Sequence, residues 1–416
     1  MIWYKKTLGE IYAIEGGSVQ TGPFGSQLHE SDYKEFGVPV IMPKDIKNDK
    51  LDLTNIAHIS DEDAKRLSQH IVKVGDIICP RRGEIGKRII IEEGNVGAFC
   101  GTGCIRLRGT GLELNQLFFF YFLQQPNVVN WIENQAVGST MMNLNTSIIK
   151  SIPVKYPPLP IQQKIASILS AYDELIENNK QRIKLLEEVA EEIYKEWFVR
   201  LRFPNYENTE FVDGLPLEWE NMRLDKVLET VKRKPKISSD QYLSEGKFPI
   251  IDQGDKFIAG YTDNESIVQF DPLPLLIFGD HTRRIKFVNY PFVSGADGTQ
   301  LLSPKNKKLL PIYFYISIKS IDLSNFHYAR HFKFLKQEYI LIPDNNTLDL
   351  FNNLTVTFFD EIQILTEKNQ LLQQTRDLLL PRLISGKLSV AGLLEHKMYK
   401  IGEDEESLSM AAEDAV

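Results

Sequence analysis

Four short basic runs are the residues of this chain that could bind an anionic ligand. They are Arg81-Arg82-Gly83 with Lys87 and Arg88, Lys232-Arg233-Lys234 with Lys236, Asp280-His281-Thr282-Arg283-Arg284-Ile285-Lys286, and Tyr328-Ala329-Arg330-His331-Phe332-Lys333-Phe334. Binding a DNA duplex needs cations for its phosphates and forked donors, such as Arg, for base edges in the major groove. One basic run alone is more often a solvated loop, but four runs spread over both halves of the chain favour a DNA-binding site.

Two further loops have residue types that could approach a nucleic acid closely. One contains Pro23, Phe24, Gly25 and Ser26, and the other contains Ser139, Thr140, Asn143 and Asn145. Small residues let a backbone approach a ligand, and Asn can bond bidentately to adenine. Ordinary turn chemistry is the simpler interpretation of both loops. For DNA contact we favour Arg81, Arg82, Arg283, Arg284 and Arg330, without assigning them to bases or to phosphates.

The motifs of catalysis and of metal binding do not match this chain. The segment Gly83-Glu-Ile-Gly-Lys87 is too short for a phosphate-binding loop, and Arg88 stands where Ser or Thr would bind magnesium. Lys155-Tyr-Pro-Pro158 lacks the Asn-Pro-Pro-aromatic order of an amino-methyltransferase. Cys100 and Cys104 have no CxxC pattern or nearby His, so we expect small buried thiols. The sequence therefore predicts a chain without catalytic residues, metal or cofactor.

Composition places the chain among soluble proteins of two or more domains. It has 416 residues, 25% of them charged, and a net charge of -8. The longest apolar run is far too short to span a membrane, and three cysteines cannot form a full disulfide framework, so we expect a cytoplasmic protein. The negative net charge includes the acidic segment 396–416, which we expect to be a disordered tail. Local charge therefore matters more than net charge for any DNA-binding surface.

Two long helices are predicted to position the basic loops. The first covers Ile161 to Phe198, and the second covers Leu348 to Leu380, where Pro381 interrupts it before Gly386 closes it. Apolar residues recur at steps of three and four on one face of each, which is the seam of a coiled coil. The first seam consists of Ile165, Leu169, Tyr172, Ile176, Asn179, Ile183, Leu186, Ala190, Ile193 and Trp197. The second consists of Phe358, Ile362, Leu365, Asn369, Leu372, Arg376 and Leu379.

Each seam contains one Asn, and a buried Asn fixes the register and orientation of a helix pair. An Asn on an exposed edge of the helix is the alternative interpretation.

The chain also repeats its own plan. Trp3-x4-Leu8-x2-Ile11 recurs as Trp219-x4-Leu224-x2-Val227, and Ile152-Pro153 recurs as Ile342-Pro343. Each repeat is a mixed segment of short strands and turns followed by a long helix; within the first, Leu114 to Ile132 is predicted to form one buried helix. Two antiparallel helices need the least connecting chain. They would relate two mixed domains by a rough two-fold axis, which suits the recurrence of duplex DNA every 34–36 Å or so.

These features are similar to those of the specificity subunits of type I restriction–modification systems. The resemblance rests on Pro157-PLPIQQKIASILSAYDELIENN, Lys195-EWFVRLRFP204 and Leu378-LLPRLISGKL388, with Gly22-PFGSQL28, Phe278-GDHTRR284, Gly295-ADGTQLL302 and Tyr328-ARHFKFL335. It implies an α+β fold with two mixed α/β target-recognition domains, at 1–155 and 203–345. Conserved long helices at 156–202 and 346–395 would separate them as an antiparallel coiled-coil spacer with a pseudo-two-fold internal repeat. The second helix is expected to be about one turn shorter than in the family.

The resemblance also implies a function and partners. Each target-recognition domain would read one half of a split DNA site through the major groove, and the subunit would carry no active site of its own. It would recruit two modification subunits, which methylate adenine with S-adenosylmethionine, and restriction subunits, which use ATP and Mg²⁺. A single-chain nuclease or methyltransferase, and a coiled-coil scaffold that binds only proteins, are the alternatives.

Overall fold

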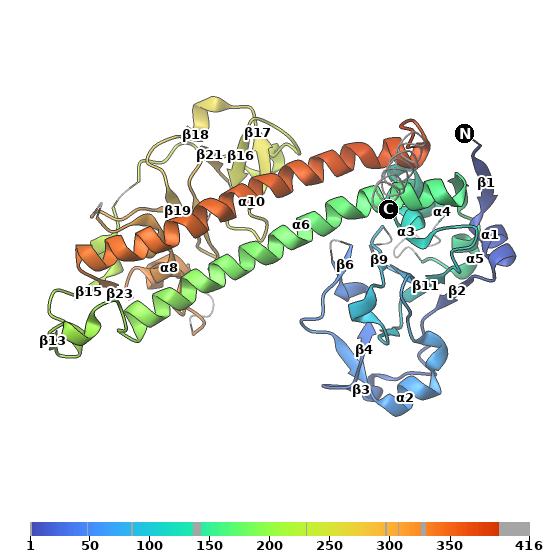
Figure 1. Ribbon diagram of the computed structural model, residues 1–416, viewed down its shortest axis with the longest axis horizontal. Helices are drawn as coiled ribbons and strands as arrows, with labels where there is room; N and C mark the ends of the chain where they lie inside the picture. The colour runs from blue at the N-terminus through green and yellow to red at the C-terminus, as the bar shows by residue number, and fades with distance from the viewer. Residues whose placement is uncertain are drawn as a thin grey trace, which may run out of the picture. The chain divides into compact units, whose positions relative to one another are not determined.

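The computed structural model describes residues 2–390 except 48, 85, 136–142, 230, 296–297, 307 and 326–329. The predicted acidic tail at 396–416 therefore lies outside the described residues. The chain divides into two compact units (Figure 1). The first unit consists of Met1–Glu177 with Asn369–Val416, and the second consists of Asn178–Lys368.

Among its described residues, the first unit contains two four-stranded sheets and two strand pairs, one of which is β5(Ile46–Lys47) with β6(Lys50–Leu51). One sheet has the order β2(Ser18–Thr21), β11(Cys104–Arg108), β8(Ile77–Pro80) and β9(Ile89–Ile90), with all neighbours antiparallel. The other has the order β10(Phe99–Cys100), β4(Val38–Ile41), β7(Ala57–Ile59) and β3(Tyr33–Lys34), in which β10 and β4 are parallel. The first and last strands of the mixed segment, β1(Tyr4–Thr7) and β12(Pro153–Tyr156), pair antiparallel. This pairing brings the start of the chain next to the entry of the first long helix.

The apolar segment around Phe118 forms two helices, so the prediction of one helix from Leu114 to Ile132 was wrong. They are α3(Gln116–Leu123), whose N-cap Asn115 accepts a hydrogen bond from the Phe118 N–H at 2.9 Å, and α4(Pro126–Gln135). The break has a physical cause, because proline disfavours the helical conformation in the residue before it and starts a helix readily. Phe118 to Leu123 are all buried in the main core of the first unit.

The second unit repeats this plan. Its sheets have the orders β20(Ile285–Val288), β19(Leu275–Gly279), β22(Thr299–Leu302), and β17(Gly260–Thr262), β16(Phe248–Ile251), β21(Phe292–Ser294), β18(Val268–Gln269). Strands β15(Glu220–Arg223) and β23(Tyr339–Ile342) pair antiparallel, as β1 and β12 do. The duplication read from the sequence is therefore present in the fold.

Strand pairing identifies equivalent elements in the two units. The parallel pair β10–β4 corresponds to β21–β16, and the antiparallel pair β8–β11 corresponds to β19–β22. An isolated antiparallel bridge between Ile71 and Phe99 stands where β18 pairs with β21 in the second unit. Likewise, the bridge between Leu228 and Pro304 stands where β2 pairs with β11.

The two long helices are α6(Leu159–Tyr194), which continues as a π-helical turn over Lys195–Val199, and α10(Asn345–Ser385). Helix α10 has 41 residues and α6 has 36, so within this chain the second helix is not the shorter one. Helix α10 ends at Ser385, before the end of the predicted range 346–395. Gly386, with φ 79°, follows it as predicted.

The prediction that Pro381 interrupts the second helix was wrong, because Pro381 lies inside α10. A proline in a helix interior costs about 3 kcal/mol through the lost hydrogen bond and a steric clash. Leu380, Leu383 and Ile384 are buried in the core of the first unit. Each such burial stabilises by roughly 1.5–3 kcal/mol, which is enough together to keep this turn helical.

Within each unit the two helices run antiparallel. In the first unit, Ile165 and Leu169 share a core with Leu380 and Leu383, and further along α6 Asp173 forms an ion pair with Arg376. In the second unit, Arg182 pairs with Glu361 at 2.6 Å, while Ala190, Tyr194 and Phe198 share a core with Leu348 and Phe351. As residue numbers rise on α6, those of the partners on α10 fall. Every residue of the two predicted seams is buried or partly buried, and Asn179 is among the buried ones.

The expectation for the cysteines is also confirmed. Cys79, Cys100 and Cys104 are free and buried, and burial raises the pKa of the Cys79 and Cys100 thiols to about 12. Across the described helices, none is both long and apolar enough to cross a membrane.

Candidate nucleic-acid interface

The loops that the sequence singled out in the first unit meet at one end of the sheet β2-β11-β8-β9. In this antiparallel sheet, the last residues of β2 and β8 face the first residues of β11, with Thr21 opposite Ile105 and Pro80 opposite Cys104. The chain segments that leave these strand ends are residues 22–26, 81–84 and 101–103, and residues 143–145 join them. We call these four segments the first loop edge.

Main-chain contacts hold the first loop edge together. The Arg81 N–H donates to the Gly103 carbonyl at 2.6 Å, and the Leu144 N–H donates to the Arg81 carbonyl at 2.9 Å. Gly22 is required at its position, because a Cβ there would lie 2.0 Å from the Gly101 carbonyl oxygen. The edge is therefore a fixed frame rather than a set of independent loops.

Several predicted DNA-binding residues at this edge have structural partners. Arg81 Nε donates to Asn143 Oδ1 and to the Leu144 carbonyl, both at 3.1 Å. Lys87 Nζ forms an ion pair with Glu84 at 2.7 Å. Asn145 caps the short helix α5(Thr146–Lys150) by accepting from the Ile148 N–H at 2.8 Å.

Other predicted residues of the first unit lie open to solvent. Phe24 is 59% exposed, and Gly25, Ser26 and Arg82 are exposed beside it in the same set of loops. Pro23 is buried beneath them, and its carbonyl accepts from Thr102 Oγ1 at 3.2 Å. Ser139 and Thr140 lie outside the described residues.

An equivalent edge exists in the second unit, at the end of the sheet β20-β19-β22. The Asp280 N–H donates to the Gly298 carbonyl at 2.8 Å, and the His331 N–H donates to the Asp280 carbonyl at 2.9 Å. The His281 N–H donates to Gln253 Oε1 at 3.1 Å. We call residues 280–284, 298, 330 and 331 with Gln253 the second loop edge.

The buried residues of the second loop edge hold the helix α9(His331–Leu335) in place. Asp280 is 4% exposed, and its Oδ1 accepts from the Phe332 N–H at 2.8 Å. His331 is also buried; desolvation and the nearby Arg283 charge lower the pKa of its imidazole below the ordinary 6.5, although the Asp280 carboxylate acts in the other direction. His331 is thus a neutral, packed residue at neutral pH rather than an exposed cation.

The remaining predicted cations of the second unit differ in their exposure and bonding. Lys232, Lys234, Arg330 and Lys333 are exposed. Arg233 is also exposed, but its guanidinium donates to Gln300 Oε1 at 2.5 Å, and its desolvation lowers the pKa of the group. The side-chain hydroxyl of Thr282 donates to the Gln253 carbonyl at 2.7 Å.

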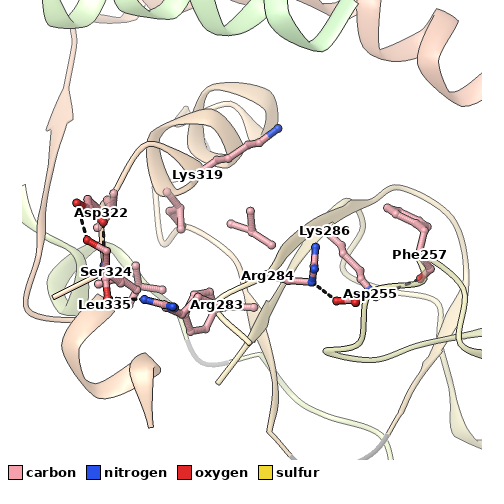
Figure 2. Close-up of a pocket in the computed structure, with 14 residues that line it drawn as sticks. Asp255, Phe257, Arg283, Arg284, Lys286, Lys319, Asp322, Ser324 and Leu335 are labelled. Atoms are coloured by element: carbon pink, nitrogen blue, oxygen red, sulfur yellow. Dashed lines mark hydrogen bonds and ion pairs between the residues drawn. The ribbon is translucent and has the colours of Figure 1, made fainter. Parts of the chain in front are cut away.

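Arg283 and Arg284 line a pocket of about 580 Å³ (Figure 2). Arg283 has φ 60°, and its guanidinium donates to the Leu323 carbonyl at 3.0 Å. Arg284 forms an ion pair with Asp255, which also lines the pocket (Figure 2). The Lys286 ammonium is buried and donates to the Asp252 and Lys256 carbonyls at 2.7 and 2.6 Å. Within the basic run at 283–286, the Lys286 side chain is therefore buried, whereas Arg283 and Arg284 bond to their own unit and remain exposed.

Sequence reasoning missed the residues that position these loops. Gln253, Asp280 and Gly298 belong to the frame of the second loop edge, but none of them was among the residues predicted to bind DNA. The one available signal was the acidic Asp280 between an apolar strand and a basic run, since a carboxylate in that place needs hydrogen-bond donors if it is buried. Gln253 and Gly298 are distant in sequence and carry no such signal.

Comparison with known proteins finds similarity to one family of proteins. Residues 2–188 match the family model described as the type I restriction modification DNA specificity domain. The type I restriction enzyme MjaIX specificity subunit of Methanocaldococcus jannaschii is 25% identical over 427 residues, covering 94% of each chain. A putative type I specificity subunit of Mycoplasma genitalium is 26% identical over 232 residues, covering 54% of this chain and 57% of that relative.

A solved structure supports the same fold. The crystal structure of the type I restriction–modification S subunit from M. genitalium superposes with a TM-score of 0.55 at 18% identity, covering 92% of this chain and 96% of that one. The resemblance expected from the sequence, and the expected fold class of mixed domains with long helices, are therefore confirmed.

Proposed function

We propose that this protein is a sequence-specific DNA-binding specificity subunit that reads a bipartite target, because residues 2–188 match the model of the type I restriction modification DNA specificity domain and the MjaIX specificity subunit aligns with 94% of the chain. The observation that carries the proposal is the pair of equivalent loop edges, one in each unit. Each edge is a rigid frame with exposed basic side chains, which a duplex needs for its phosphates and base edges. Two edges on a duplicated fold match a target with two half-sites.

We place the chain in a complex with two modification subunits and with restriction subunits. Adenine methylation with S-adenosylmethionine and cleavage with ATP and Mg²⁺ would belong to those partners, and this chain would carry no cofactor. A groove of about 380 Å³ on α6 supports docking of a partner helix, because it is lined by Leu185, Val189, Ile193 and Trp197. Leu185 is 59% exposed, and Glu188, Glu192 and Glu196 border the apolar residues.

The proposal is tested with the chain co-expressed with its modification partner. Sequencing of methylated adenines in the host DNA should give one motif with two specified halves and an unspecified gap. In fluorescence anisotropy, the affinity of the complex for a duplex with this motif should fall steeply as salt rises, because counterion release drives phosphate contacts.

Two results would contradict the proposal. DNA turnover by the purified chain alone, with Mg²⁺, ATP and S-adenosylmethionine, would indicate a single-chain enzyme. An absence of salt-dependent DNA affinity in the complex would indicate a scaffold that binds only proteins.

A further inference from the structure

The two loop edges share one main-chain frame, and this frame identifies equivalent residues. Arg81 donates its N–H to Gly103 and accepts from Leu144, whereas Asp280 donates to Gly298 and accepts from His331. Both residues follow equivalent strands, since Pro80 is opposite Cys104 and Gly279 is opposite Thr299. Arg81 is therefore equivalent to Asp280, and the next residues, Arg82 and His281, are equivalent to each other.

The side chains of Arg81 and Asp280 perform the same task with opposite charge. Each side chain also bonds to the segment whose N–H donates to the main-chain carbonyl of the same residue. Arg81 donates to Asn143 and the Leu144 carbonyl, and Asp280 accepts from the Phe332 N–H. Asp280 is 4% exposed and Arg81 is partly buried. These contacts engage the Asp280 carboxylate and the Arg81 Nε–H, so both side chains help to position the loops.

Most other cations near the frame are also engaged. Lys87 pairs with Glu84, Arg284 pairs with Asp255, and Arg283 donates to the Leu323 carbonyl on the wall of the pocket (Figure 2). Arg82 and His281 differ from them, because both are exposed and, among the described residues, neither side chain has a hydrogen bond or ion pair. Each is a free polar side chain at the same place on its frame.

The backbone at these two positions is fixed, which base reading requires. Arg82 forms an antiparallel bridge with Asn143, and the His281 N–H is bonded to Gln253 Oε1 at 3.1 Å. A Cβ on Gly298 would lie 2.7 Å from His281 Cδ2, so the imidazole packs directly over this glycine. Discrimination between bases depends on side chains held within about 0.5 Å of the productive geometry. The exposed Lys232 and Lys234 lack such a frame and suit phosphates, which carry no sequence information.

We infer that Arg82 and His281 are the equivalent base-reading residues of the two units, and that Arg81 and Asp280 are their positioning residues. The inference rests on the proposed function. The ligand of each is the major-groove edge of a purine: Arg82 can donate two hydrogen bonds to guanine O6 and N7, and His281 can donate one to a purine N7. The two half-sites then differ in how strictly they specify this one base.

Three variants of the complex with the modification subunit test the inference: Arg82→Ala, His281→Ala and, as a matched control, Lys234→Ala. Methylated-motif sequencing should show that Arg82→Ala relaxes one position in one half-site and His281→Ala relaxes one position in the other half-site. Anisotropy with single-base variants of the motif should show discrimination falling by about 10- to 100-fold at that position for Arg82→Ala. Lys234→Ala should weaken binding to all sequences alike and shift the salt dependence.

The positioning role of Asp280 needs its own pair of variants. Asp280→Ala should relax the same position as His281→Ala, whereas Asp280→Asn, which keeps an oxygen acceptor for the Phe332 N–H, should recover much of the discrimination. A purely structural role for Asp280 predicts instead a lower melting temperature with an unchanged motif.

The inference is overturned if Arg82→Ala and His281→Ala relax the same half-site, or if either weakens binding evenly across all sequences. A wild-type complex without any sequence-specific methylation would instead contradict the proposed function itself. The two failures are therefore distinguishable in one set of measurements.

Discussion

Within the second unit, Asp344 links Trp219 to the first turn of α10 through hydrogen bonds. Its replacement is a direct test of what stabilises this part of the fold. Asp344 precedes α10, and its Oδ1 accepts from the Thr347 N–H at 3.0 Å, which is the geometry of an N-cap. Its Oδ2 accepts from the indole N–H of Trp219 at 2.9 Å and from Thr347 Oγ1 at 2.6 Å. Trp219 is 6% exposed, so its indole N–H has little access to water.

The structure gives the expected cost of Asp344→Ala. Loss of the helix cap costs about 1 kcal/mol. A buried indole N–H left without an acceptor costs about 1–3 kcal/mol more. The second unit should therefore lose about 2–4 kcal/mol of stability. Burial alone would raise the pKa of the Asp344 carboxyl, but hydrogen bonds from Thr347 and Trp219 outweigh it and lower the pKa below 3.8. Because the folded pKa is depressed, this contribution is present above about pH 3.8 and is lost as pH falls through the folded value.

Urea unfolding and hydrogen exchange of the peptides at the start of α10 measure this effect. A double-mutant cycle isolates the Trp219 bond: Asp344→Asn and Trp219→Phe, singly and together, should show a coupling of about 1–3 kcal/mol. Phe keeps most of the aromatic packing while removing the donor. A cost below about 0.5 kcal/mol for Asp344→Ala, or a cycle without coupling, would refute the reasoning that this carboxylate joins the helix start to Trp219.

Three further outcomes are expected. Gly386→Ala should destabilise the first unit by about 1–3 kcal/mol in calorimetry, because Gly386 has φ 79° and a Cβ there would lie 2.5 Å from the Trp3 ring; an unchanged melting temperature would contradict this. Arg376→Met should cost about 1–2 kcal/mol in urea unfolding through loss of the ion pair with Asp173, whereas an equal cost at low and high salt would argue against an electrostatic origin. His331 is buried with its pKa lowered from 6.5, so the unfolded chain binds the extra proton and stability should fall as pH drops below about 6.5. His331→Gln should reduce the difference between the urea midpoints measured at about pH 7.5 and 5.5. An unchanged difference would show that His331 is not the source of this pH dependence.

The long helices could be predicted from the sequence because their packing follows a local rule. Apolar residues at steps of three and four determine which face is buried, and this holds for Ile165 and Leu365 alike. The rule fails where a local signal competes with distant packing. Pro381 is a helix breaker by itself, but burial of Leu383 and Ile384 against the first unit's core outweighs its cost.

The candidate interface was predictable as a set of loops but not as a set of free side chains. A basic run identifies cations, yet their availability depends on partners far away in the sequence. Arg283 donates to a carbonyl 40 residues away, and Arg81 is bonded to Asn143, 62 residues away. Arg81 and Arg82 are neighbours of the same residue type, but Arg81 is hydrogen-bonded within its unit, whereas the Arg82 side chain is exposed. The sequence of the run Arg81-Arg82 does not predict which of the two is exposed. Only the pairing of strand ends does so.

The opposite charges of Arg81 and Asp280 explain how a duplicated fold can read two different half-sites. Main-chain hydrogen bonds of 2.6–2.9 Å form the frame in both units, and their donors and acceptors stand at equivalent positions. The side chain that completes the frame can therefore be a cation that donates to carbonyl and amide oxygens, or an anion that accepts from N–H groups. Since the frame survives such an exchange, the next residue can also change without disturbing the fold. Divergence at Arg82 and His281, the proposed base-reading residues, would then alter the base that one unit prefers while the strand pairing of both units stays the same.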